Sequence, residues 1–162
     1  MQSVYVETTI PSYLASQASS QASIAVDQQA TREWWEQERK RFRLFTSAFT
    51  IDECSRGDTL VAERRLQYLA DMPELSVPED LNLLEYDIIN LFQLPKKAFT
   101  DASHLALAIV HRMDYLLTWN CTHLANAVLQ KELVEYCNYH DLHIPIVCTP
   151  ETLIPRHEQS DN

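Results

Sequence analysis

The chain contains one glycine, Gly57, among its 162 residues. Glycine is the residue that most readily adopts a positive backbone φ, which the tight turns of β-hairpins require. A hairpin-rich β fold is therefore disfavoured. The glycine motifs that cradle nucleotide phosphates need at least two glycines, so they are excluded as well.

Short apolar runs that are typical of strands alternate with helical segments along the chain. Strands are predicted at residues 3–7, 43–46, 75–77, 115–118 and 144–148. Helices are predicted at residues 11–15, 26–42, 47–57, 58–72, 81–92 and 100–113, and as one or two helices at 121–140, with a polar loop at 16–23. This alternation predicts an α/β fold with a central parallel sheet of about four to five strands and helices on both faces. We expect one domain over residues 1–155 and a polar C-terminal tail over residues 156–162.

No apolar run approaches the roughly 20 residues of a membrane-spanning helix, so no membrane association is expected. The N-terminal residues lack the basic and then apolar layout of a signal peptide. The four cysteines are scattered without a C-x-x-C pair, which indicates neither a disulfide framework nor a thiolate zinc site. Reduced thiols and a cytoplasmic location are the expectation.

The formal net charge of −10 argues by itself against nucleic acid as a partner. Bound cations would offset an acidic pocket, however, so the total charge does not exclude RNA. Three basic clusters could contact RNA or simply form solvated helix faces. They are residues 39–43, Arg64 with Arg65, and Lys96 with Lys97.

Four polar side chains stand where an open parallel sheet would gather them. Glu7 and Asn120 end two predicted strands, and Glu53 and Asp101 lie near the starts of predicted helices. The carboxyl ends of parallel strands share one edge, where ligand crevices form. Several oxygen donors at that edge would suit a hard divalent cation. We therefore expect Glu7, Glu53 and Asp101 to converge there, with Asn120 beside them.

The strand that ends in Glu7 should be buried, so its carboxylate needs a partner or a bound ion. The hydroxyls of Thr8 and Thr9 could orient it. Alternatively, Thr9 caps the following helix and Glu7 faces solvent.

Asp101, Asn120 and the two nearby histidines each allow two interpretations. Asp101 could ligate a metal or stabilise the start of its helix, where a carboxylate is favoured. Asn120 could accept a hydrogen bond from a metal-bound water or fix the next turn. His104 and His123 are expected to act as hydrogen-bonding residues rather than as ligands, because no zinc-site spacing is present.

The order of these stretches resembles the PIN-domain family and, within it, the VapC-like ribonuclease toxins of type II toxin–antitoxin systems. VYVETTIPSYL is similar to the opening strand and acid of the family, and TSAFTIDECSRGD resembles its second motif. TDASHLALAIVHRMDYLLTWNCTHLAN resembles the third and fourth motifs, and IVCTPETLI the closing strand. The resemblance spans residues 3 to about 154, and YLLTWN with the helix before it is its most specific part.

The resemblance implies a metal-dependent endoribonuclease that hydrolyses phosphodiester bonds of RNA. It makes Glu7, Glu53 and Asp101 the ligands of Mg²⁺ or Mn²⁺ and adds Asn120 to the catalytic residues. Thr8, Thr9, His104 and His123 would support them. Glu7 replaces the usual aspartate of the family, and Asn120 stands where aspartate is frequent. The implied partners are RNA, a small antitoxin protein and a second copy of the chain in a homodimer.

Two other functions are compatible with acids at strand ends. A catalytically weak or inactive PIN fold could act as a protein-binding module, and the residues at positions 7 and 120 favour that alternative. A phosphotransfer enzyme of the haloacid-dehalogenase type needs an aspartate nucleophile and a second aspartate two residues later. The sequence ETT at residues 7–9 offers neither.

Overall fold

The computed structural model describes residues 1–154 of the chain. The predicted tail at residues 156–162 and the predicted boundary at residue 155 lie outside the described residues.

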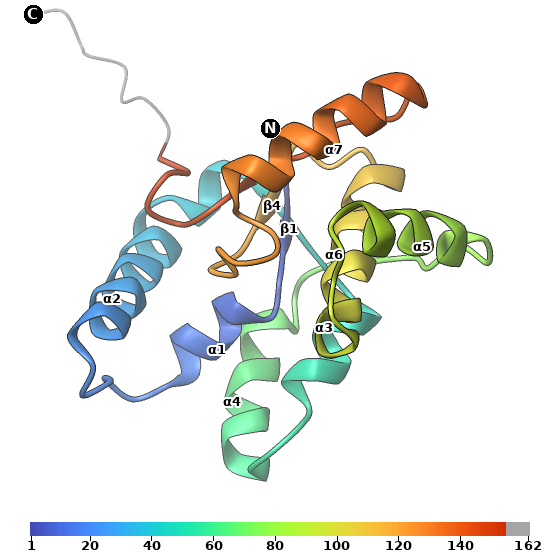
Figure 1. Cartoon of the computed structure of the whole chain (residues 1–162). Coiled ribbons are helices and arrows are strands. Elements are labelled where there is room, and N and C mark those ends of the chain that lie inside the picture. Colours follow the sequence, from blue (N-terminus) through green and yellow to red (C-terminus); the bar gives the residue numbers. More distant parts are fainter. Residues whose placement is uncertain (155–162) are drawn as a thin grey trace, which may run out of the picture.

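Five strands and seven α-helices make up the described part of the chain (Figure 1). The strands are β1 (Ser3–Val6), β2 (Arg43–Ser47), β3 (Glu74–Leu75), β4 (Tyr115–Leu117) and β5 (Ile146–Cys148). The helices are α1 (Thr9–Ala15), α2 (Ala22–Gln37), α3 (Ala48–Cys54), α4 (Thr59–Leu69), α5 (Leu81–Leu91), α6 (Phe99–Val110) and α7 (Ala127–Tyr139). Two short 3₁₀ turns, η1 (Arg39–Arg41) and η2 (Lys96–Ala98), precede β2 and α6.

All five strands run parallel, in the order β3-β2-β1-β4-β5. The first strand of the chain is therefore the central strand, and Tyr5 pairs with Phe45 on one side and Leu116 on the other. From β1 the chain moves to β2 on one side and later returns to β4 on the opposite side. The crevice outside the carboxyl ends of β1 and β4 is thus a topological switch point, where α/β folds bind ligands. The predicted α/β class with its parallel sheet is confirmed.

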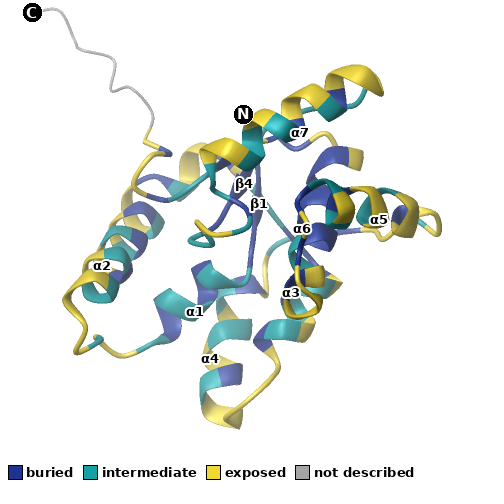
Figure 2. Cartoon of the chain, in the orientation of Figure 1, coloured by how far each residue is buried: buried dark blue, intermediate teal, exposed yellow. Residues whose placement is uncertain are grey.

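Helices cover both faces of the sheet, as predicted (Figure 2). Every residue of β1 is buried, and its side chains alternate between two cores. Tyr5 enters the core formed with α5, α6 and α7, whereas Val4 and Val6 enter the core formed with α1 and α2. Burial on both faces explains the apolar run VYV, and the buried Ser3 hydroxyl before it donates to Asp114.

Two helices begin four or more residues away from their predicted starts. Helix α2 begins at Ala22 rather than near residue 26, because the alanines of the polar stretch are strong helix formers. The loop before it is ordered by Gln28, whose amide group donates to Ser16 Oγ and the Gln17 carbonyl.

The segment 121–140 holds one helix, α7, which begins six residues later than the predicted start. Asn126 caps it by accepting from the backbone N–H groups of Val128 and Leu129. The preceding residues form turns because the amides of Leu124 and Ala125 donate to the Asn120 carbonyl.

The caps around α3 and α4 follow the sequence signals. Ser47 accepts from the Thr50 amide and begins α3, and Asp58 accepts from two amides at the start of α4. Between them, Gly57 has a φ of +86°, a conformation that glycine adopts without steric cost. The one glycine thus lies in the connection that follows Glu53.

Among residues 1–154, no helix combines the length and the apolar character that crossing a bilayer requires.

Candidate metal centre

Glu7 lies at the switch point, directly after the last residue of β1. Its backbone N–H donates to the Leu117 carbonyl of β4 at 3.1 Å, so the main chain on either side of the carboxylate is fixed. The side chain is only 4% exposed. A carboxylate at this depth requires compensating donors or a cation.

Hydroxyl and amide donors converge on one oxygen of Glu7. Oε2 accepts from the Thr9 amide at 3.0 Å, from the Thr9 hydroxyl at 2.6 Å and from the Thr118 hydroxyl at 2.7 Å. Thr8 is the N-cap residue of α1, and the Thr9 hydroxyl donates to Glu7 instead of capping the helix. The alternative of a capping Thr9 with a solvated Glu7 is therefore wrong. Oε1 takes part in no hydrogen bond within residues 1–154.

Glu53 reaches the same place from the last turn of α3, so the prediction that it lies near the start of a helix is wrong. Its Oε1 accepts from the Thr8 hydroxyl at 2.9 Å and lies 2.6 Å from Nε2 of His104. Partial burial acts to raise the pKa of Glu53, but the hydrogen bonds from His104 and Thr8 and the nearby charges of His104 and Arg56 hold it below its usual value. The carboxylate is therefore ionised at neutral pH. Its Oε2 is free of hydrogen bonds to residues 1–154.

His104 lies in the first half of α6 and is fully buried. Burial lowers the pKa of an imidazole, but Tyr5, Glu53 and Glu7 outweigh this effect and raise the pKa of His104 to about 10. A protonated ring satisfies both contacts, with Nε2–H donating to Glu53 and Nδ1–H donating to the Tyr5 hydroxyl at 2.6 Å. The Tyr5 hydroxyl in turn contacts Ser47 Oγ at 2.6 Å. Both histidine nitrogens are in use, which agrees with the predicted hydrogen-bonding role.

Glu7, Glu53 and His104 form what we call the inner group. One potential ligand atom from each lies within 4.8 Å of the others. Each carboxylate uses one oxygen for hydrogen bonds and keeps the second available. Two carboxylates with available oxygens suit Mg²⁺ or Mn²⁺, which prefer oxygen ligands, better than they suit a soft metal.

Asp101, Asn120 and His123 form a second set, the outer group. Asp101 Oδ2 lies 3.0 Å from Nδ1 of His123, whose amide donates to Asn120 Oδ1 at 2.9 Å. Of the two interpretations of Asn120, the side chain therefore fixes the next turn. His123 has a hydrogen-bonding partner, as predicted.

The two groups are connected through Thr118 and through α6. The Thr118 hydroxyl donates to Glu7 and accepts from the backbone N–H of Asn120 at 2.9 Å. Asp101 precedes His104 by three residues on α6, which places the two side chains on one face, one helical turn apart. The 4.8 Å group does not include Asp101. Its position one turn before His104 puts it on the side of α6 that faces this group. It makes no capping hydrogen bond to α6, and its role as a metal ligand stays a prediction.

Three residues of the site escaped the sequence analysis: Tyr5, Thr118 and Trp119. A hydroxyl in the middle of a buried strand needs a hydrogen-bond partner, so the sequence could have predicted a buried polar contact at Tyr5. Thr118 also ends a buried strand, directly before Asn120. Trp119 follows it, and its backbone N–H donates to the Thr9 hydroxyl at 2.8 Å.

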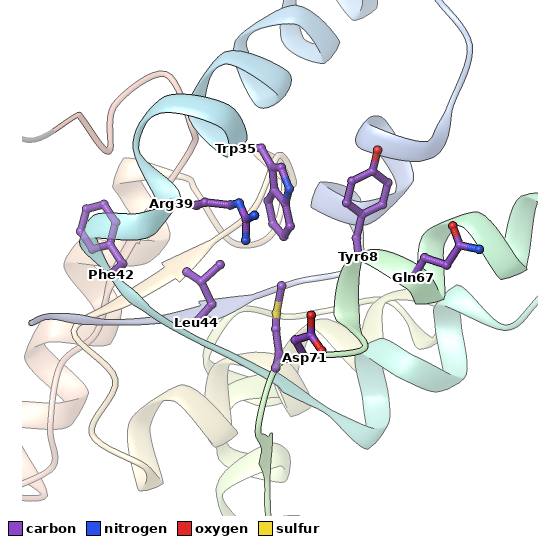
Figure 3. Close-up of a pocket in the computed structure, with 8 residues that line it drawn as sticks. Trp35, Arg39, Phe42, Leu44, Gln67, Tyr68 and Asp71 are labelled. Atoms are coloured by element: carbon purple, nitrogen blue, oxygen red, sulfur yellow. The ribbon is translucent and has the colours of Figure 1, made fainter.

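A hollow of about 310 Å³ lies elsewhere, between α2, β2 and α4 (Figure 3). Trp35 and Arg39 line it from one side, with the Arg39 guanidinium 4.9 Å from the indole centroid, and Tyr68 lines it from α4. Leu44, at its floor, is near the amino end of β2. The carboxyl ends of the strands lie at the opposite edge, and no residue of the inner or outer group lines this hollow.

Comparison of the chain with known protein families, with curated proteins and with solved structures found no match. The function is therefore inferred from the sequence motifs and from the residues and contacts of the site.

Proposed function

We propose that this protein is a metal-dependent endoribonuclease that hydrolyses phosphodiester bonds of RNA, in the manner of the VapC-like PIN-domain toxins that its motifs resemble. One observation carries the proposal. Glu7 and Glu53 lie together at the switch point of a parallel sheet, and each keeps one carboxylate oxygen free of hydrogen bonds to residues 1–154.

Glu7 and Glu53 would hold the cation, with Asp101 approaching from the neighbouring turn of α6. When bound, Mg²⁺ or Mn²⁺ lowers the pKa of a coordinated water and stabilises charge on a scissile phosphate. The chain contributes positioning: Thr9 and Thr118 fix Glu7, while Thr8 and His104 fix Glu53. The His104 charge keeps Glu53 ionised without occupying its second oxygen.

The charge balance predicts an order of binding. A phosphodiester backbone approaching two carboxylates in a protein of net charge −10 is repelled. A bound cation removes part of that repulsion, so metal binding should precede RNA binding.

Protein partners belong to this proposal as well. A small antitoxin-like protein with an arginine or lysine at the site would satisfy the same carboxylates and compete with the cation. A homodimer formed through apolar helix faces is the other expected partner. Leu83 and Tyr86 on α5 are each 67% exposed and lie on one face of that helix.

The test is a calorimetric titration with Mn²⁺, combined with cleavage of a mixed-sequence single-stranded RNA. We expect Mn²⁺ binding and Mn²⁺-dependent cleavage by the wild-type protein and by Glu36→Gln, which changes an exposed glutamate on α2. Glu53→Gln should lose both. RNA cleavage that persists in EDTA, or equal activity of Glu53→Gln, would remove the proposal. A folded protein that binds neither Mn²⁺ nor RNA supports the protein-binding module instead.

A further inference from the structure

The inner group is flanked by an aromatic pair, Tyr13 and Trp119, which has no role in the proposed metal site. Trp119 directly follows Thr118, and its backbone N–H donates to the Thr9 hydroxyl. Both Thr118 and Thr9 also donate to Glu7 Oε2. The backbone of Trp119 is thus anchored to one of the two hydroxyls that position the carboxylate, and it directly follows the residue that carries the other.

The Trp119 ring is held in place from a third direction. Its Nε1–H donates to the Thr31 hydroxyl on α2 at 2.7 Å, and that hydroxyl donates to the Asp27 carbonyl at 2.6 Å. The ring therefore has little rotational freedom to lose when something stacks on it. A fixed aromatic surface binds planar ligands at lower entropic cost than a mobile one.

Tyr13 lies four residues after Thr9 on α1 and so on the same side of the helix. Its ring stacks on Trp119 with centroids 6.1 Å apart and planes inclined by 28°. Both side chains are partly exposed. Burial raises the pKa of Tyr13, and the charges of Asp27, Cys121 and Glu7 raise it further. The Tyr13 hydroxyl has no hydrogen-bond partner within residues 1–154.

We infer that Tyr13 and Trp119 form a nucleobase-binding subsite that takes a base of single-stranded RNA next to the phosphodiester to be cut. The inference rests on the proposed function and specifies its substrate. A single strand can present the face of an unstacked base to an aromatic ring, whereas an A-form duplex keeps its bases stacked inside. Base-paired RNA should therefore be a poor substrate.

The net charge of the protein favours RNA binding by stacking over RNA binding by phosphate contacts. Most RNA-binding surfaces gain affinity by releasing counterions from phosphates, which a chain of net charge −10 does poorly. Stacking on neutral rings is unaffected by that charge, and it tolerates any base because every base has a π-face. Affinity for RNA should therefore depend on the aromatic pair more than on lysines and arginines, and it should depend weakly on salt.

Simple packing of α1 against the segment after β4 would also place these two rings together. The two explanations differ in what a leucine at position 13 does. Tyr13→Leu keeps an apolar contact with Trp119 but removes the stacking face, so it should spare folding and weaken RNA binding. Tyr13→Phe keeps the ring and should lose less than Tyr13→Leu.

The test combines the Tyr13→Leu variant with RNA substrates that lack a single base. A short single-stranded RNA is prepared intact and as a series in which one ribose lacks its base, at positions on either side of the observed cut. Removing the base that stacks should lower kcat/KM of the wild-type protein about tenfold, within the range of base–aromatic stacking. Tyr13→Leu should lose a similar factor on intact RNA and nothing further on the base-free RNA. Tyr139→Leu, at an 86% exposed tyrosine on α7, should behave as wild type.

Binding of a fluorescently labelled oligomer, measured by anisotropy, provides a readout that does not need cleavage. Weaker binding by Tyr13→Leu without any wild-type cleavage would support the subsite and contradict the proposed ribonuclease. If the wild type cleaves RNA and the losses from Tyr13→Leu and from base removal multiply, the subsite is overturned. The proposed ribonuclease activity is then retained. Binding and cleavage that are both indifferent to position 13 would also overturn the subsite.

Discussion

The inner and outer groups each contain a histidine beside a carboxylate, but the two pairs are held differently. His104 is 1% exposed and contacts Tyr5 and Glu53 through its two ring nitrogens. His123 is 24% exposed, and among residues 1–154 its ring hydrogen-bonds only to Asp101. The first pair is fixed before any ligand arrives, whereas the second can rearrange when one binds. Each prediction below tests this difference, from the largest expected effect to the smallest.

Glu7→Gln should have the largest effect. It replaces a carboxylate that is 4% exposed with a neutral amide of nearly the same volume. Loss of an outer hydrogen-bonding partner costs a metal site about 10–100-fold in affinity or activity, and loss of a ligand should exceed that. Mn²⁺ affinity by calorimetry and cleavage rate should both fall by more than this range. A variant with wild-type Mn²⁺ affinity would show that the inner group is not the metal site.

His104→Gln should change the pH dependence of stability. Because the pKa of His104 is raised from 6.5 to about 10 by folding, its contribution is complete below pH 6.5 and is lost as pH rises through about 10. The lowered pKa of Glu53 acts in the opposite sense, with a contribution present above 4.5 and lost as pH falls through the folded value.

Urea unfolding at pH 6, 8 and 9.5 measures this effect. The free energy of unfolding should fall over that range in the wild-type protein and less steeply in His104→Gln. At pH 6 the variant should be less stable by about 1–3 kcal/mol, because Tyr5 and Glu53 lose a buried partner. His140→Gln, at an exposed histidine, is the matched control. Parallel curves for the wild type and His104→Gln would contradict a buried imidazolium.

Asp101→Asn should reduce cleavage by about tenfold, the lower end of the range for an outer partner of a metal site. The asparagine oxygen can still face His123, so the fold and the turn should be retained. The cleavage rate at several Mn²⁺ concentrations provides the measurement. A loss as large as that of Glu7→Gln would move Asp101 into the inner group as a full ligand.

Asn120→Asp should have the smallest effect. An aspartate can accept the same hydrogen bond from the His123 amide, so the free energy of unfolding should change by no more than about 0.5 kcal/mol. The added charge should raise the cleavage rate at saturating Mn²⁺ if a weakly occupied second cation limits it. An unchanged or lower rate at saturating Mn²⁺ would exclude that limitation.

The sheet and the approximate place of the acids could be predicted because their signals are local. The run SVYV, the strand YLL and the long apolar helix α6 each show their burial in consecutive residues. Glu7 and Asn120 are polar groups at the ends of such runs, which brings them to one edge of a parallel sheet.

The grouping of the side chains could not be predicted in the same way. His104 meets Tyr5 across 99 residues and Glu53 across 51 residues, and no spacing in the sequence records these contacts. The separation of Asp101 from the inner group depends on a similar long-range contact, with His123. The late start of α7 depends on Asn120, whose carbonyl and side chain hold the preceding turns.

The central place of β1 also determines when the site can exist during synthesis. Glu7 is made early, but Thr118, which donates to it, follows 111 residues later. At about 5–20 residues per second, a ribosome needs roughly 5–20 s to cover that stretch. Until β4 leaves the exit tunnel, β1 has a neighbour on one side only, and Glu7 lacks its Thr118 donor and the Leu117 carbonyl. A nascent ribonuclease of this design would be unable to cut its own message until nearly the whole chain has been translated.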